Sequence, residues 1–245
     1  MANDLIINGV SLHNIYDVWV SGRYVLGSPA RQSERVDIPG RNAGVINDLG
    51  TYHNQTIKYP LYIRDSLSSV LPELRDWLGS LSGYVAFSDT FNPDEIRYGR
   101  IQAGLEVSPS IQHRAGGFVL SLDCRPERYL SSGQRPVTIS DSEPLTNPTY
   151  QTARPLLTIR QQSTSTPAIV QVGTYEIRVD SGSTSPVRVD CDAREILGTD
   201  PANVAITQAG EIAADYPRLP GGVSTTVRPV SGVLDYKITP RWWRL

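Results

Sequence analysis

The sequence predicts a mainly β protein with two domains and one α-helix. Apolar residues alternate with polar ones along many short segments, and turn-forming pairs separate these segments. Glycine and proline together supply 38 of the 245 residues, more than the average of ~12 per cent, which favours many turns over long helices. A chain of this length is comfortable for two domains of ~100 to 200 residues each.

The alternation predicts strands with one side facing inward, as in antiparallel sheets. It is clearest in Ile57, Tyr59, Leu61 and Ile63; in Phe118, Leu120, Leu122 and Cys124; in Tyr175, Ile177 and Val179; and in Leu234, Tyr236 and Ile238. Turns are predicted at Asn8-Gly9, Pro39-Gly40, Ser181-Gly182 and Pro220-Gly221-Gly222.

One segment has helical rather than strand spacing. Its apolar residues recur every three or four positions, at Leu67, Val70, Leu71, Leu74, Trp77, Leu78 and Leu81. This pattern predicts an amphipathic helix that packs across an open end of a sheet. Ser69 is the expected N-cap, Pro72 falls in the first turn, and Gly79 ends the helix.

A domain boundary is predicted within residues 131–152, which are rich in Ser, Thr and Pro and nearly free of large apolar residues. We place the break near residue 142. Residues 1–142 then form a domain that contains the helix. Residues 143–245 form an all-β domain of about 100 residues, the size of a β-sandwich.

Charge and apolar content exclude two classes of partner. The formal net charge is −2 and no basic stripe is present, so sequence-specific nucleic-acid binding is not expected. No stretch approaches the ~20 apolar residues of a membrane span, and the N-terminal residues lack the pattern of a secretory signal. We therefore expect synthesis in a cytoplasm, with Cys124 and Cys191 as reduced core thiols.

Catalytic and metal-binding motifs are not found. His13, His53 and His113 have no second ligand at metal-binding spacing, and no G-x-S-x-G elbow or phosphate loop is present. We expect no metal site and no cofactor.

Two groups of carboxylates could in principle serve a glycoside hydrolase: Asp89, Asp94 and Glu95 in one loop, and Asp180, Asp190 and Asp192 around an apparent hairpin over residues 178–192. Aspartate beside Asn, Pro, Gly or Ser more often caps a turn, which favours a structural role.

The C-terminal pair Trp242 and Trp243 leaves another function open. Exposed aromatic side chains can stack on sugars or lie in a protein interface, whereas one tryptophan of an adjacent pair often packs inward. A carbohydrate-binding module or adhesin is therefore the alternative to an assembly protein.

The order and spacing of the segments resemble the distal tail protein (Dit) family of long, flexible-tailed bacteriophages over nearly the full length. The first half contributes LIINGVSL, RVDIPGRNAGV, IKYPLYI, a helix ending in DWL, SDTFNPDEIRYGRI and FVLSLDCRPERYL. The second half contributes NPTYQTARPLLTI, a hairpin into VRVDCDAREIL, DYPRLPGGVSTT and ITPRWWRL. Ala43, between Asn42 and Gly44, lengthens the expected loop by one residue.

The resemblance implies an N-terminal β-sandwich or barrel-like domain that forms a hexameric ring, and a C-terminal galectin-like β-sandwich. It implies a non-enzymatic virion protein, the hub that links the tail-tube protein to the tail-associated protein of the tip. In some members receptor-binding proteins attach around the hub. We expect Pro39, Gly40, Arg41, Asn42 and Gly44 to lie at or near a subunit contact, since Arg41 offers a bidentate fork at a sharp turn.

Overall fold

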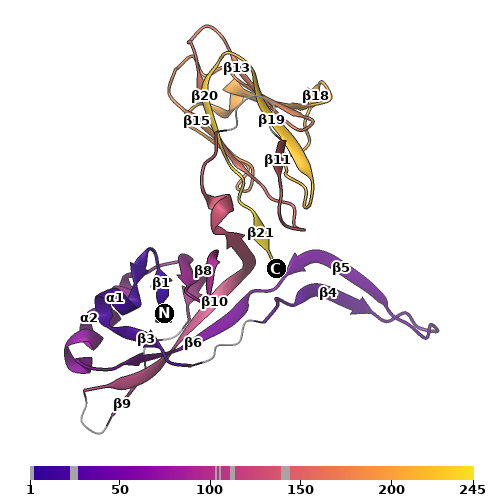
Figure 1. Ribbon diagram of the computed structural model, residues 1–245. Helices are drawn as coiled ribbons and strands as arrows, with labels where there is room; N and C mark the ends of the chain where they lie inside the picture. The colour runs from indigo at the N-terminus through magenta and orange to yellow at the C-terminus, as the bar shows by residue number, and fades with distance from the viewer. Residues whose placement is uncertain (1–2, 23–26, 103, 105, 111–113, 139–143) are drawn as a thin grey trace. The chain divides into compact units, whose positions relative to one another are not determined.

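The computed structural model confirms a mainly β fold (Figure 1) and describes residues 3–22, 27–102, 104, 106–110, 114–138 and 144–245. The chain divides into two compact units, residues 1–128 with Leu245, and residues 129–244. The predicted break near residue 142 lies outside the described residues. The division comes earlier because Leu130 is buried in the core of the second unit and Val137 bridges to Ile238 there.

The first unit contains two helices and ten strands in its described part. They are β1 (Leu5–Ile7), β2 (Val10–Ser11), α1 (Leu12–Tyr16), β3 (Val18–Val20), β4 (Arg31–Val36), β5 (Val45–Tyr52), β6 (Gln55–Ile63), α2 (Leu67–Ser80), β7 (Val85–Asp89), β8 (Asn92–Ile101), β9 (Val107–Pro109) and β10 (Gly116–Leu130), whose last two residues belong to the second unit.

The main sheet of this unit follows the order β2-β1-β7-β8-β10-β6-β3, and β9 also pairs with β10. The central pair β10 and β6 is antiparallel, and its register sets apolar residues opposite one another: Phe118 with Leu61, Leu120 with Tyr59, and Leu122 with Ile57. All six side chains are buried, as the alternation predicted. Each contributes about 1.5–3 kcal/mol by leaving water.

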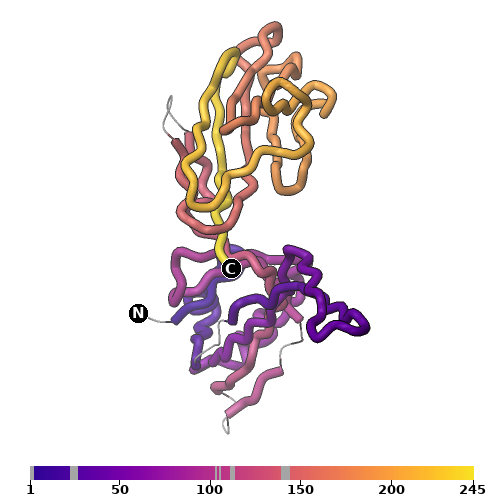
Figure 2. Tube along the Cα trace, turned by 90° about the vertical axis from the view of Figure 1, so that its right-hand side faces the viewer, coloured from indigo at the N-terminus to yellow at the C-terminus, as the bar shows by residue number. Residues whose placement is uncertain are grey.

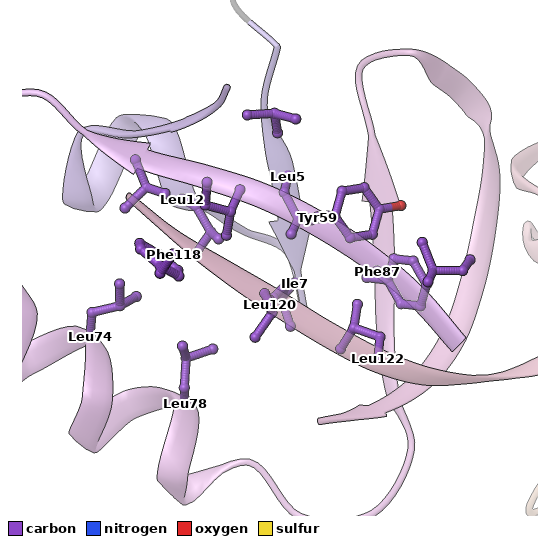
Figure 3. Packing of buried hydrophobic residues seen from close by; sticks show 14 of the residues in the cluster. Leu5, Ile7, Leu12, Tyr59, Leu74, Leu78, Phe87, Phe118, Leu120 and Leu122 are labelled. Carbon is purple, nitrogen blue, oxygen red and sulfur yellow. The ribbon is translucent and has the colours of Figure 1, made fainter. Parts of the chain in front are cut away.

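Helix α2 packs on this apolar face. Figure 3 shows Leu74 and Leu78 pointing from the helix toward Phe118 and Leu120 of β10, and both leucines are buried. The predicted helix is therefore confirmed, and its apolar stripe faces the core.

The expected ends of α2 were wrong. The helix begins at Leu67, so the N-cap is Ser66, which makes no side-chain cap, while the hydroxyl of Ser69 donates to the carbonyl of Ser66. Pro72 consequently lies in the second turn rather than the first, and the helix continues through Gly79 to Ser80. Burial of Leu67 against the sheet fixes this earlier start.

The second unit is built from two sheets around one core. Its elements are η1 (Ser131–Gln134), β11 (Pro144–Thr146), β12 (Leu156–Gln161), β13 (Ala168–Val172), β14 (Tyr175–Val179), β15 (Val187–Asp190), β16 (Glu195–Leu197), η2 (Pro201–Asn203), β17 (Val204–Gln208), β18 (Glu211–Ile212), β19 (Ser224–Ser231), β20 (Val233–Thr239) and β21 (Trp243–Arg244). The sheets have the orders β11-β19-β13-β14-β17-β18 and β16-β15-β12-β20. Buried residues of both, such as Val170 and Ile159, share the core.

Two local expectations in this unit were wrong. Residues 178–192 do not form a hairpin, because β14 belongs to the six-stranded sheet and β15 to the four-stranded one, so the chain crosses between layers. Leu234 does not face inward with Tyr236 and Ile238; it is 55% exposed. The register of β20 on β12 shifts at this point, from Arg160 opposite Asp235 to Gln161 opposite Val233, and this bulge turns Leu234 outward.

Candidate assembly interface

Strands β4 and β5 form a free-standing hairpin, residues 31–52, which we call the arm. They pair with each other, and within the described part of the chain neither pairs with another strand. Figure 1 shows the arm extending away from the main sheet of its unit, and Figure 2 shows it at the margin of that unit in a second direction. A two-stranded hairpin alone is marginally stable in water, so a partner surface would stabilise it.

Two ion pairs lie on the arm, and one of them joins its two strands. Arg31 lies 2.7 Å from Asp48 across the hairpin, and Arg35 lies 2.9 Å from Asp37 near the tip. The backbone N–H of Gly50 and the guanidinium of Arg31 lower the pKa of Asp48 by hydrogen bonding to its charged form. Because both pairs are exposed, they add little stability, and only the pair of Arg31 and Asp48 favours the register of the two strands.

The arm also carries large apolar side chains that remain in water. Val36 lies directly opposite Val45, and Ile46 lies opposite Arg35. The exposed members of this apolar set are Val36 (48%), Ile38 (39%), Val45 (47%), Ile46 (69%) and Leu49 (58%). Several large, exposed apolar side chains on a slender hairpin are typical of a protein interface rather than of a solvated surface.

The tip of the arm is the loop that the sequence singled out, residues 37–44. The backbone N–H of Arg41 donates to the carbonyl of Ile38 at 3.1 Å, and Gly40 has a φ of +83° after Pro39. This is the geometry of a type II turn, in which Pro at the second position and Gly at the third are preferred. Pro39, Gly40, Arg41, Asn42 and Gly44 are brought together here.

Gly44 ends the tip, and the side chains of Asp37 and Arg35 lie against it. A Cβ at this position would lie 2.6 Å from the Oδ1 of Asp37 and 2.9 Å from the Nε of Arg35. The guanidinium of Arg41 has no ion-pair partner among the described residues, although Asp37 is four positions away. The tip therefore presents an unneutralised cation.

The sequence reasoning missed the apolar set behind the tip. Val45, Ile46 and Leu49 do not follow a period of two, so they define no single inward face. This irregular spacing was the available sequence signal that the strand has no buried face, since a strand buried on one face would have kept the alternation of apolar and polar residues.

The two C-terminal tryptophans do not form an exposed aromatic platform. Trp242 is 5% exposed within the core of the second unit. Trp243 is partly buried against the same core, and its indole N–H donates to the carbonyl of Thr152 at 3.0 Å. Trp242 thus has no open face for a sugar.

The carboxylates are occupied by structural contacts. Asp89 caps its own turn by accepting from the backbone N–H groups of Phe91 and Asn92, and Glu95 pairs with Arg97. Asp190 forms a bidentate pair with Arg241, with distances of 2.7 and 2.8 Å.

The remaining members of the two groups are exposed. They are Asp94, Asp180 and Asp192, the last of which lies 3.9 Å from Arg154. These contacts account for the Asp-rich loops as capping and pairing sites.

Histidines and cysteines are likewise placed apart. His13 stacks on Trp19 at 4.0 Å, His53 is exposed beside Gln32, and His113 lies outside the described residues. Both cysteines are free and buried, and burial raises the pKa of Cys124 and of Cys191 to about 12, so their thiols stay protonated.

Neither a metal centre nor a membrane span emerges from these placements. In the part of the chain that the structure describes, no three His, Cys, Asp or Glu side chains group as metal ligands would. Its helices are also too short and too polar for one to cross a bilayer.

Comparison with solved structures identifies the architecture. The crystal structure of the Dit protein of phage SPP1, described as a paradigm of the hub adsorption apparatus in phages that infect Gram-positive bacteria, matches with a TM-score of 0.67 and 16% identity over 97% of both chains. The chain has the Dit fold. The resemblance inferred from the sequence is thereby confirmed at the level of the fold.

Baseplate structures share this fold. In the phage p2 baseplate in its activated conformation, a chain from the form with strontium matches with a TM-score of 0.55 and 9% identity over 97% of this chain and 96% of that one. The form with calcium gives 0.54 and 10% over 97% of each. Neither a family model nor a curated protein matches the sequence.

Proposed function

We propose that this protein is a distal tail protein, a non-enzymatic hub at the tip of a phage tail that assembles as a ring of six copies. The observation that carries the proposal is the arm, which leaves Val36, Val45 and Ile46 exposed on a hairpin without a partner of its own. The Dit fold, shared with hub and baseplate chains over nearly the whole length, agrees with this role.

The arm can join copies into a ring. A projecting hairpin and the surface that receives it are different parts of one chain, so each copy can offer its arm to one neighbour and receive the arm of the other. Head-to-tail contacts generate a ring when the rotation closes. Such a ring would also cover the exposed edges of β4 and β5, which otherwise invite aggregation.

We assign ring formation to residues 1–142 and an outward role to residues 143–245, as a galectin-like β-sandwich. The arm and its tip belong to the first part, and every buried residue of the second core except Leu130 belongs to the second part. In this proposal the ring links the tail-tube protein to the tail-associated protein of the tip, and receptor-binding proteins attach around it. The protein would be made in the host cytoplasm and end in the virion.

The alternative of a carbohydrate-binding module receives less support. It depended on exposed tryptophans, and Trp242 lies in the core while Trp243 uses its N–H within the chain. A hydrolase receives less support too, because Asp89 and Asp190 serve turns and an ion pair.

Mass measurement tests the proposal directly. Six copies of the 26.9 kDa chain give a particle of about 161 kDa, which light scattering should detect above a threshold concentration and electron microscopy should show as a ring. A monomer at every concentration, with no rings even when tube protein is added, would contradict it.

A further inference from the structure

A cavity in the first unit has the shape and charge to receive a cationic side chain. It has a volume of about 420 Å³, within the range of ~300 to 1,000 Å³ typical of binding pockets. It lies between the start of β1, the end of β3 and the turn between β7 and β8. Val20 and Phe91 are apolar members of its lining, and Asp4 and Asp89 are its acidic members.

Both carboxylates are buried, and the described part of the chain gives neither of them a counter-charge. Asp4 is 9% exposed and Asp89 is 5% exposed. Among the described residues, no Lys, Arg or His side chain lies within ion-pair distance of either one. Within the described residues their oxygens accept hydrogen bonds from neutral donors, and these bonds orient the carboxylates without supplying a positive charge. Buried charges of this kind are usually paired.

The same chain carries the complementary group. Arg41 stands at the exposed tip of the arm with no ion-pair partner among the described residues. Its guanidinium suits a carboxylate, and its aliphatic stem suits an apolar wall such as the ring of Phe91, which is 72% exposed. The arm projects from its own sheet, so the tip is free to meet another copy.

We propose that, in the ring, Arg41 of each copy inserts into the Asp4 and Asp89 cavity of the next copy. This inference rests on the proposed ring and names the surface that receives the arm. One desolvated cation then neutralises two buried carboxylates, while Val20 and Phe91 cover its stem. The pairing also selects a single register between neighbours, because a shifted arm would leave all three charges unpaired.

The carboxylates can be neutralised without removing their hydrogen bonds. In Asp4 one oxygen accepts from the backbone N–H of His13 and the other from the hydroxyl of Ser11. In Asp89 one accepts from backbone N–H groups and the other from the hydroxyl of Tyr59. An asparagine keeps its oxygen on the N–H and donates its amide to the hydroxyl, which also accepts. Asp4→Asn and Asp89→Asn thus change charge and little else.

A double-mutant cycle on the full chain tests the pairing. We expect Arg41→Ala, Asp4→Asn and Asp89→Asn each to raise the concentration at which half of the ring dissociates by about tenfold or more. Combining Arg41→Ala with either asparagine should add little. The controls are Asp94→Asn, an exposed carboxylate, and Arg178→Ala, an exposed cation of the second unit; thermal melts confirm folding of every variant.

Cross-linking gives a second readout that does not depend on stability. With Cys124 and Cys191 buried, the pair Arg41→Cys and Phe91→Cys should be joined between copies by a short bismaleimide into covalent chains of up to six. The pair Arg41→Cys and Tyr150→Cys, also exposed, should not.

The possible outcomes distinguish a failure of the cavity assignment from a failure of the proposed ring. A ring whose dissociation is unchanged by Arg41→Ala, or in which the single effects multiply in the double variants, overturns the cavity assignment and leaves the proposed function standing. A wild-type chain that never forms a ring overturns both.

Discussion

Val36 of β4 lies directly opposite Val45 of β5, and both side chains are about half exposed. A cross-strand apolar pair usually faces a core, yet the arm has no core to face. Replacing both residues by serine should leave the melting of the isolated subunit within about 0.5 kcal/mol of wild type, because exposed positions contribute little to folding.

The same double substitution should weaken the ring by about tenfold or more, since the apolar surface that it removes is buried only on assembly. Light scattering over a dilution series measures this. Val230→Ser, an equally exposed valine of the second unit, is the matched control. If Val230→Ser weakened the ring as much as the double substitution in the arm does, the arm would not be the interface.

The second unit should fold without the first, provided that its N-terminal segment is included. Leu130 is buried in its core, and Gly133 packs so closely on Trp242 that a Cβ would lie 2.5 Å from the Trp242 backbone nitrogen. A fragment of residues 129–245 should therefore be a folded monomer.

A fragment of residues 143–245 should be less stable by about 2 kcal/mol or more, the cost of losing a buried leucine. Urea unfolding followed by circular dichroism compares the two fragments. Residues 1–142 alone should still form the ring. If the C-terminal fragment were oligomeric and the N-terminal fragment monomeric, ring formation would have to be assigned to the second unit instead.

The pair of Asp190 and Arg241 should make the second unit sensitive to acid. Burial raises the pKa of Asp190, but the bonds from Arg241 and from the backbone N–H groups of Ala193 and Asp192 outweigh it, so the pKa is lowered. The stability that this shift represents is present above the unfolded-state pKa of ~3.9 and is lost as the pH falls below it.

Asp190→Asn should cost about 1–3 kcal/mol at neutral pH and flatten the decline of stability below about pH 4. Unfolding curves across this range provide the measurement. Asp180→Asn, an exposed carboxylate, should change neither the stability nor its pH dependence. If the stability of the Asp190→Asn protein depended on pH as that of the wild type does, the pair of Asp190 and Arg241 would contribute nothing to stability.

The purified protein should not hydrolyse peptidoglycan or capsule glycans. The carboxylates that a glycosidase would need are held by turn N–H groups at Asp89 and by Arg241 at Asp190. Zymography and release of reducing sugar test this expectation. Reproducible turnover that disappears in Asp89→Asn or Asp190→Asn would replace the structural role by a catalytic one.

Much of the core could be predicted from the sequence. Ile57, Tyr59, Leu61 and Ile63 are buried along β6 as their spacing requires, and Asn8-Gly9 makes the turn between β1 and β2. The apolar stripe of α2 likewise identified the one long helix. These features depend on the period of the backbone and on local turn geometry, and both are determined by residues that are neighbours in the sequence.

The candidate interface was predicted only at its tip. Pro39-Gly40 specifies a turn by its own backbone preferences, so residues 37–44 could be singled out. The sequence does not show that the strands on either side of the tip pair with no other strand. The identity of a valine does not reveal whether its side chain is buried or exposed. The cavity was missed for a related reason: Asp4 and Asp89 are far apart in sequence and meet only through the sheet.

What the sequence alone determined is therefore local: strand periods, turns and the side of each strand that is apolar. Which sheet each strand joins was decided by tertiary structure, as the crossing from β14 to β15 and the bulge at Leu234 show. Strand pairing is a choice among distant segments, and its free energy depends on every neighbour at once. The exposure of the arm follows from that choice, since the main sheet is complete without β4 and β5.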